Sequence, residues 1–143
     1  MVLLNREQIK EVIPHREPFL MIDEVIALEP GKKCIAKKYL RDDDFWVSGH
    51  FPAMPVTPAV MVVEMLSQTG AVCIGTAEEY KGKTAALARI EKAKFRGQLM
   101  PGEVAVLEVE VSKLRGNTGV SKAKATVDGD VVVSAELTFS FEG

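Results

Sequence analysis

The segment TPAVMVVEMLSQTGAVCIG, residues 57–75, predicts a single long helix. Thr57 favours the N-cap and Pro58 favours the first helical position, so the helix is expected to begin there and to run to about Gly75. Apolar residues occupy nearly every face of this helix, a pattern that is typical of a helix buried in a protein core. We therefore expect the rest of the chain to wrap around it.

Most of the remaining sequence has the features of β-strands. We expect strands over residues 20–29, 33–40, 84–96, 103–114, 118–129 and 131–142. The turn sequence DGD at 128–130 predicts a hairpin between the last two strands, and Asn5 is a suitable N-cap for a short helix over 5–12. Because the β-α-β alternation of a parallel sheet is missing, the expected fold class is α+β, with one domain over residues 1–143 and an antiparallel sheet around the long helix.

The composition excludes several classes of protein. The chain has 143 residues, of which 47% are hydrophobic and 27% charged, as in ordinary globular domains and unlike disordered chains. Its net charge is 18 − 20 = −2, which argues against nucleic acid as the main partner. The two cysteines, Cys34 and Cys73, lack the spacing of metal ligands and are too few for a disulfide scaffold, so no structural metal is expected.

Two segments of the sequence indicate where in the cell the protein is expected. The first 19 residues carry several charges and lack the apolar region of a secretory signal. Glu64, Ser67 and Gln68 interrupt the long apolar segment, whereas a membrane span needs about 20 nearly uninterrupted apolar residues. We expect no membrane span and a cytoplasmic protein.

Glu64 is an anomaly in the middle of the predicted helix, where its neighbours are valine, methionine and leucine. An ionised carboxylate in apolar surroundings is costly unless it is paired or protonated. Gln68 follows one helical turn later on the same face and can hydrogen-bond it. Two interpretations stay open at this point: a perturbed acid that takes part in chemistry, or a glutamate at one wet seam of the helix that is satisfied by Gln68.

His50 lies between Gly49 and Phe51, in the proline-rich segment that leads into the helix. Histidine is a natural general base near neutral pH, although a lone histidine beside a loop is more often structural. The helix N-terminus offers free N–H groups and a positive dipole end, which suit an oxygen that becomes negative. The combination points to proton abstraction next to a carbonyl group, whereas His15 is expected to have a structural role.

The segment GHFPAMPVTPAVMVVEMLSQTGA (49–71) resembles the FabZ-type β-hydroxyacyl-acyl carrier protein dehydratases, whose pattern combines GHFP, spaced prolines, a glutamate and a glutamine four residues later. IPHREPFLMIDEV (13–25) and RIEKAKFRGQLMPGEVAVLEVEV (89–111) resemble two further segments of the family, in the same order. The resemblance covers most of the chain. It implies a hot-dog fold, in which an antiparallel sheet wraps around one long helix.

The resemblance also implies an activity. The family removes water from a (3R)-hydroxyacyl thioester of acyl carrier protein in fatty acid biosynthesis and forms the trans-2-enoyl thioester. The implied base is His50 and the implied acid is Glu64, which Gln68 would orient. No metal or redox cofactor is implied, because proton transfer and oxyanion stabilisation suffice for this chemistry.

Substrate contacts follow from the same resemblance. Backbone N–H groups near Ala59 would hold the thioester oxygen, and Phe51 and Met54 would line an apolar tunnel for the acyl chain. Three departures from the family pattern stand out. Ala59 and Arg89 stand where glycine is usual, and Ala53-Met54 stands where many members have glycine followed by a polar or basic residue. The added methyl group of Ala59 leaves its N–H in place but can crowd the thioester.

The implied assembly is a homodimer with two sites at the subunit interface, or a trimer of such dimers, with His50 and Glu64 of each site contributed by different subunits. Lys92, Lys94 and Arg96 are expected to alternate on one face of a strand, where they form either a solvated face or a docking patch for acyl carrier protein. Two alternative functions stay open: a hot-dog thioesterase or coenzyme A thioester hydratase, and a non-catalytic paralogue that binds the acyl carrier.

Overall fold

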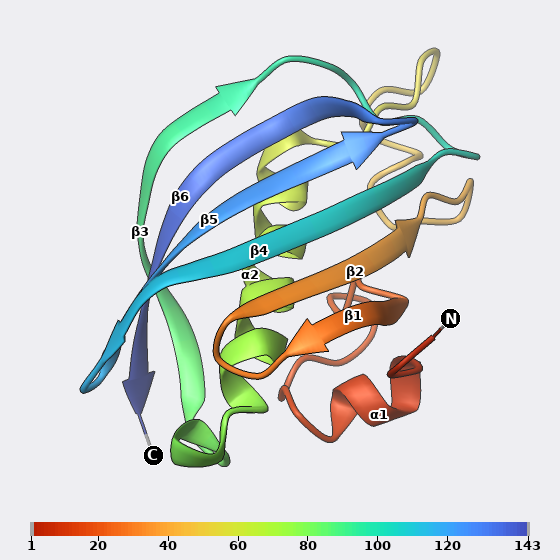
Figure 1. Cartoon of the computed structure of the whole chain (residues 1–143). Coiled ribbons are helices and arrows are strands. Elements are labelled where there is room, and N and C mark those ends of the chain that lie inside the picture. Colours follow the sequence, from red (N-terminus) through yellow and green to blue (C-terminus); the bar gives the residue numbers. More distant parts are fainter. Residues whose placement is uncertain (1, 143) are drawn as a thin grey trace.

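Helix α2 lies along the inner side of a curved, six-stranded antiparallel sheet in the computed structural model, which describes residues 2–142 (Figure 1). The helical elements are α1 (Arg6–Lys10), α2 (Ala59–Gly75) and the 3-10 helix η1 (Glu78–Tyr80). The strands are β1 (Glu24–Glu29), β2 (Lys33–Tyr39), β3 (Thr84–Phe95), β4 (Val104–Arg115), β5 (Thr118–Val127) and β6 (Asp130–Glu142), in the order β1-β2-β4-β5-β6-β3. All neighbouring strands are antiparallel, which confirms the α+β prediction.

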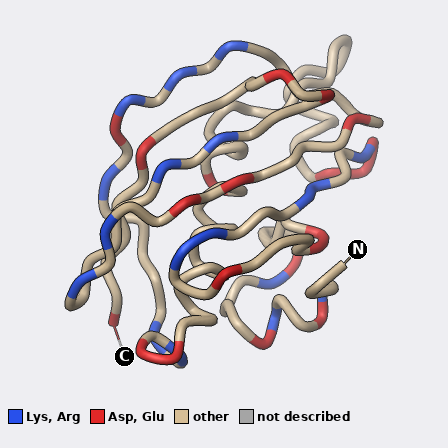
Figure 2. Tube along the Cα trace, in the orientation of Figure 1, with Lys and Arg blue, Asp and Glu red and all other residues tan. Residues whose placement is uncertain are grey.

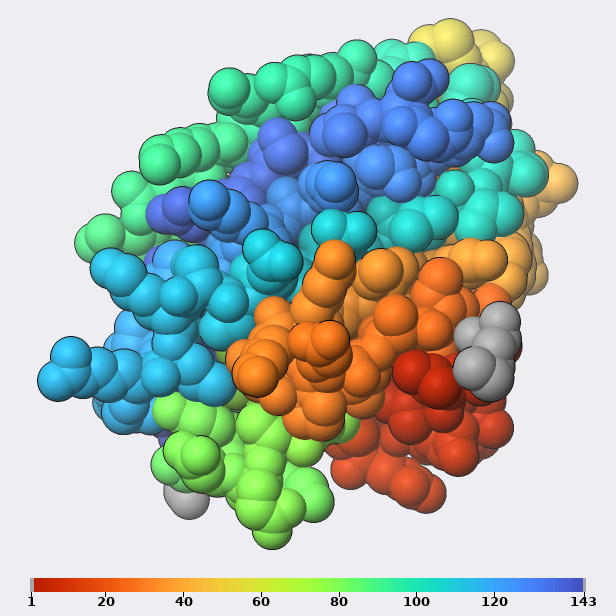
Figure 3. Space-filling model, in the orientation of Figure 1, coloured from red at the N-terminus to blue at the C-terminus, as the bar shows by residue number. Residues whose placement is uncertain are grey.

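The inner side of the sheet and α2 bury each other, and from the outer side the strands cover most of the helix (Figure 3). Every residue from Val62 to Ile74 is buried except Glu64. At one close approach, a Cβ atom added to Gly70 would lie 2.7 Å from the Phe139 ring of β6, so glycine is needed there. Glu64, the single acidic residue of α2, is the one residue between Val62 and Ile74 that is not buried.

The N-terminus of α2 differs from the prediction. Pro58 is the N-cap (φ −57°, ψ 133°), Ala59 is the first helical residue, and no side chain caps the helix. Thr57 lies outside the helix because the extended ψ of Pro58 places the helix start at Ala59. The Thr57 N–H donates to the Leu99 carbonyl oxygen at 2.8 Å. The prediction that Thr57 is the N-cap was wrong.

Strand β1 begins four residues later than predicted, because side chains bind the backbone that precedes it. The Gln68 side-chain oxygen accepts a hydrogen bond from the Met21 N–H at 2.9 Å. The Arg6 guanidinium donates to the carbonyl oxygens of Leu20 and Ile22. Leu20, Met21 and Ile22 are buried, as the apolar pattern indicated, but these backbone groups bind side chains instead of a neighbouring strand.

Two local predictions are confirmed. Asn5 caps α1, since its side chain accepts from the Gln8 N–H at 2.9 Å and the Gln8 side chain accepts from the Asn5 N–H at 2.8 Å. Asp128 and Gly129 form the turn between β5 and β6, both with the positive φ (50° and 84°) that a two-residue hairpin turn requires. Helix α1 is shorter than predicted, and η1 was not predicted.

Within residues 2–142, strand β3 pairs with β6 alone, at the edge of the sheet, and is exposed along most of its length. The register shifts between Glu91 and Lys94, where Lys92 has a positive φ of 54°. The bulge falls within the segment for which alternation of Lys92, Lys94 and Arg96 was predicted, and Arg96 lies one residue beyond the strand. Lys92 and Lys94 still lie beside one groove on the outer face of the sheet.

The outer face of the sheet carries opposite charges on neighbouring strands (Figure 2). Glu110 of β4 lies opposite Lys33 of β2 and Lys122 of β5, and Glu108 of β4 lies opposite Lys124 of β5. Opposite charges across a strand pair contribute roughly 0.2–1 kcal/mol each. The positive charges of the lysines in β2 and β5 are therefore partly neutralised by glutamates of β4.

Candidate active site

Glu64 lies near the middle of α2, with its side chain 24% exposed among buried neighbours. The Gln68 side-chain nitrogen donates a hydrogen bond to Glu64 Oε2 at 3.0 Å, one helical turn away. This confirms that the two residues pair, as their spacing predicted. A structural pair and a catalytic pair share this contact.

The orientation of the Gln68 amide is fixed by the backbone around it. Gln68 is fully buried, and its Oε1 accepts from the Met21 N–H at 2.9 Å while its Nε2 also donates to the Phe19 carbonyl oxygen at 2.8 Å. Because a backbone N–H only donates and a carbonyl only accepts, the amide can sit in one orientation alone. Gln68 therefore always presents an N–H to Glu64.

His15 is the residue at this site that the sequence did not predict. Its Nε2 lies 3.7 Å from Glu64 Oε2, and its Nδ1 is a buried nitrogen without a hydrogen-bond partner among residues 2–142. The two residues are far apart in the sequence, and no local spacing connects them. The only signal was the position of His15 in the first of the family-like segments, so its assignment to a purely structural role missed this contact.

His50 lies in the loop that leads into α2 and is half-buried. Its Nδ1 lies 2.9 Å from the Val56 carbonyl oxygen, and the Val56 N–H donates to the His50 carbonyl oxygen at 2.9 Å. Since the carbonyl accepts, Nδ1 must carry the hydrogen, and in the neutral ring Nε2 keeps a free lone pair. The arrangement can hold a general base with Nε2 as its reactive atom.

The two predicted catalytic side chains do not meet within one chain. In the described part of the chain, the polar contacts of Glu64 are with Gln68 and His15, whereas the His50 ring contacts Val56 and stacks on the Phe51 ring with centroids 4.2 Å apart. No hydrogen bond or ion pair joins His50 of the loop to Glu64 of α2 within residues 2–142.

The residues predicted to bind substrate lie around the N-terminus of α2. Ala59 and Val60 are exposed at the uncapped end of the helix, where the first N–H groups lack intrahelical partners. Phe51 and Met54 are about half exposed, as is Phe19, whose carbonyl binds Gln68. Exposed apolar side chains are thus frequent in the segments that lead into α2 and bind Gln68.

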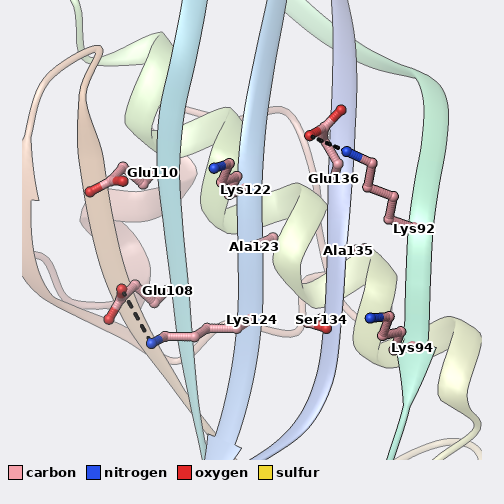
Figure 4. A pocket seen from close by; sticks show the side chains of 10 residues that line it. All are labelled: Lys92, Lys94, Glu108, Glu110, Lys122, Ala123, Lys124, Ser134, Ala135 and Glu136. Atoms are coloured by element: carbon pink, nitrogen blue, oxygen red, sulfur yellow. Dashed lines mark ion pairs between the residues drawn. The ribbon is translucent and has the colours of Figure 1, made fainter.

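A groove of about 500 Å³ lies elsewhere, on the outer face of the sheet (Figure 4). It is lined by Lys92, Lys94, Glu108, Glu110, Lys122, Ala123, Lys124, Ser134, Ala135 and Glu136. Lys92 lies 4.0 Å from Glu136, and Lys124 lies 3.9 Å from Glu108. Two of the three residues predicted to dock the carrier protein therefore line a mixed-charge groove with α2 behind it, while Arg96 is not part of its lining.

Neither cysteine forms part of a reactive site. Cys34 and Cys73 are both free and buried, and burial raises the pKa of the Cys34 thiol well above its usual range and that of Cys73 to about 11. Within residues 2–142, no group of three or more His, Cys, Asp or Glu side chains is arranged to hold a metal ion. No helix in the same range is long and apolar enough to cross a membrane.

Comparisons with known proteins find similar sequences along nearly the whole chain. A model of the FabA-like domain family matches residues 13–136. The 3-hydroxyacyl-[acyl-carrier-protein] dehydratase FabZ of Staphylococcus saprophyticus is 49% identical over 140 residues, which cover 98% of this chain and 97% of that protein. FabZ of Staphylococcus aureus strain Newman is 46% identical over 140 residues, with 98% and 96% covered.

Solved structures are similar in fold at much lower sequence identity. The dehydratase heterocomplex ApeI:P from Xenorhabdus doucetiae superposes with a TM-score of 0.78 at 16% identity, covering 94% of this chain and 91% of that one. The TT0310 protein from Thermus thermophilus superposes with a TM-score of 0.66 at 17% identity, covering 88% and 98%.

Proposed function

This chain belongs to the FabA-like family, and from that premise we propose how its residues carry out the reaction of a 3-hydroxyacyl-[acyl-carrier-protein] dehydratase. It is a hydro-lyase of the FabZ type with the hot-dog fold, and its reaction is part of fatty acid biosynthesis. Near 50% identity along almost the full length of both chains carries this assignment.

His50 acts as the base in the proposed mechanism. The substrate is a (3R)-hydroxyacyl thioester, and its C2 proton is acidified by the neighbouring thioester carbonyl. The Nδ1–H bond to the Val56 carbonyl oxygen supports this role, because it orients the ring and leaves Nε2 to accept the proton. The first N–H groups of α2, at Ala59 and Val60, stabilise the thioester oxygen as it gains negative charge.

Glu64 acts as the acid. The electrons of the C2–H bond form the C2–C3 double bond as the C3–O bond breaks, and protonated Glu64 gives its proton to the departing hydroxyl group, which leaves as water. The product is the trans-2-enoyl thioester. His50 has then gained one proton and Glu64 has lost one, and exchange with solvent resets both. The Gln68 N–H, which can only donate, supports the orientation of the Glu64 carboxyl group.

A second copy of the chain completes the site in this proposal. Within residues 2–142, no polar contact joins His50 to Glu64, apolar side chains are exposed near both, and β3 is an exposed edge that pairs with β6 alone. A homodimer that unites His50 of one chain with Glu64 of the other accounts for all three features, and a trimer of dimers is the larger assembly that we consider. A cytoplasmic location stays a prediction.

The substrate is delivered by acyl carrier protein, for which Lys92, Lys94 and Arg96 remain the proposed docking residues. The exposure of Lys92 and Lys94 supports this role, whereas the pairing of Lys92 with Glu136 weakens the positive charge that they offer. Reversing the charge of all three residues should weaken binding of the carrier protein, and unchanged binding would exclude them as the docking site.

Turnover of a (3R)-hydroxyacyl-acyl carrier protein tests the function directly. Ultraviolet absorbance reports formation of the enoyl thioester, and mass spectrometry of the carrier reports the loss of one water. Cleavage of the thioester, seen as a free thiol, would indicate a thioesterase instead. Binding of the acyl carrier without turnover would indicate a non-catalytic paralogue and would contradict the proposed roles of His50 and Glu64.

A further inference from the structure

Two side chains from distant parts of the sequence face the same oxygen atom of Glu64. Gln68 donates to Oε2 at 3.0 Å, and Nε2 of His15 lies 3.7 Å from Oε2 on a different segment of the chain. No polar contact of Glu64 Oε1 is found among residues 2–142. The two oxygens of the carboxyl group therefore have different surroundings: Oε2 accepts a hydrogen bond from Gln68 and faces His15, whereas Oε1 has neither contact.

The hydrogen-bonding capacity of His15 assigns its role. With its hydrogen on Nε2, the His15 ring directs a donor at Glu64 Oε2, which lies 3.7 Å away. The other ring nitrogen, Nδ1, is buried and makes no hydrogen bond in the described chain. Because Nδ1 makes no hydrogen bond there, Nε2 is the ring nitrogen through which His15 interacts with Glu64.

The backbone that carries His15 is held by Arg16. The Arg16 guanidinium donates to the carbonyl oxygens of Ile13 at 2.9 Å, His15 at 2.6 Å and Lys10 at 3.1 Å. Ile13 itself is buried in the core. The backbone that carries the imidazole is therefore held by contacts that do not involve Glu64.

We propose that His15 is a positioning residue for the elimination of water. Together with Gln68 it holds Oε2 of Glu64, so that Oε1 carries the proton and faces the hydroxyl group that departs. Without His15 the carboxyl group is held at one point and rotates more freely, so the protonated oxygen faces the substrate less often. The inference rests on the proposed function, because it assumes that Glu64 is the acid.

A matched pair of variants separates this role from simple packing. Gln and Met side chains have nearly the same shape, but only Gln can place an N–H where Nε2 of His15 lies. We expect His15→Met to lower kcat by about tenfold to a hundredfold with little change in KM, because misplacing a catalytic group by roughly 1 Å costs up to about a hundredfold. His15→Gln should recover most of the activity.

A second measurement tests the coupling to Glu64. In a Glu64→Gln background the carboxyl proton is gone, so adding His15→Met should cause little further loss of residual activity. Thermal unfolding of each protein shows whether it is folded. If His15→Met does not fold, His15→Asn, which is polar but too short to reach Glu64, replaces it in both comparisons.

The outcomes divide clearly. Wild-type kcat in the His15→Met protein, or equal losses in His15→Met and His15→Gln, would overturn the positioning role, since the donor at Nε2 would then be irrelevant. An additional loss in the Glu64→Gln background as large as in the wild type would also overturn it. No turnover by the wild-type protein would contradict the proposed function itself, and with it this inference.

Discussion

Two hydrogen bonds connect His50 and Val56 across one loop. Nδ1 of His50 lies 2.9 Å from the Val56 carbonyl oxygen, and the Val56 N–H donates to the His50 carbonyl oxygen at 2.9 Å. The loop lies directly before α2, so its shape sets where the imidazole stands relative to the helix N-terminus. The hydrogen bond at Nδ1 orients the imidazole ring, so Nε2 is the nitrogen that is left for proton transfer.

This division predicts different results for two substitutions of His50. His50→Asn can keep a donor near the Nδ1 position and so preserve the bond to Val56, but it has no base at the position of Nε2. We expect it to fold like the wild type and to lose activity by about 10²–10⁴-fold, the usual contribution of a general base.

His50→Ala loses the bond to Val56 as well, so it should be equally inactive and also less stable, by about 0.5–1.5 kcal/mol for one hydrogen bond. Steady-state turnover and thermal unfolding measure the two effects, and activity within a few-fold of wild type would exclude His50 as the base.

Gln68 should matter for stability as well as for activity. Replacing it by leucine removes the partners of the Met21 N–H and the Phe19 carbonyl oxygen. An unsatisfied buried polar group costs about 1–3 kcal/mol, so we expect Gln68→Leu to lower the free energy of unfolding by about 2–5 kcal/mol. Urea unfolding followed by circular dichroism measures it. A midpoint equal to that of the wild type would show that the network contributes nothing to stability.

The contact between α2 and β6 predicts a steric effect at Gly70. The methyl group of Gly70→Ala would lie 2.7 Å from the Phe139 ring, which is buried and cannot easily move. We expect a loss of about 1–3 kcal/mol in the free energy of unfolding. Gly49→Ala is the control, because nothing lies within 4 Å of its added Cβ. Phe139→Leu should restore part of the loss in the Gly70→Ala protein, and the same unfolding measurement tests all three.

The sequence was most informative where contacts are local. Glu64 and Gln68 are four residues apart on one helix, so their hydrogen bond follows from helical geometry alone. The burial of α2 follows equally from its apolar composition, and the α+β fold follows from strand alternation without β-α-β units. The hairpin turn and the Asn5 cap are of the same kind, since each depends on a few adjacent residues.

The errors arose where one segment binds another that is distant in the sequence. Thr57 lies in a loop that is bound to Leu99, one residue before the N-cap Pro58, and β1 starts late because Gln68 binds the backbone of Met21. The approach of His15 to Glu64 depends on how the segment before β1 packs on α2. No periodicity within a single segment contains that information, and the same is true of the bulge in β3.

Glu17 makes the stability of the N-terminal region sensitive to acid. Hydrogen bonds from Arg6 and Lys10 lower the pKa of the Glu17 carboxyl group from 4.5 to about 2. Because the folded-state pKa is below the unfolded value, the stabilisation is fully present above about pH 4.5 and is lost as the pH falls toward 2. Glu17→Gln should therefore lower the unfolding temperature at pH 7 but not at pH 2. An equal change at both pH values would contradict this origin, and added salt should reduce the effect at pH 7.

A site shared between two chains predicts that inactive variants complement each other. A mixed dimer of His50→Asn and Glu64→Gln chains contains one site with both residues intact and one site with neither. Random exchange between equal amounts gives half mixed dimers, so we expect about one quarter of wild-type activity in a two-fold symmetric dimer. Turnover is measured after the two proteins have been mixed and incubated long enough for subunits to exchange.

The control for complementation is a chain that carries both substitutions, mixed with either single variant, because no combination then forms a site with both residues. Activity should stay at the background level in these mixtures. Size-exclusion chromatography with light scattering establishes that all the proteins are dimers or larger. If the single variants stay inactive after exchange has been verified with differently tagged chains, then His50 and Glu64 act within one chain. The exposed apolar side chains around Phe51 and Met54 would then need another explanation, such as direct cover by the acyl chain.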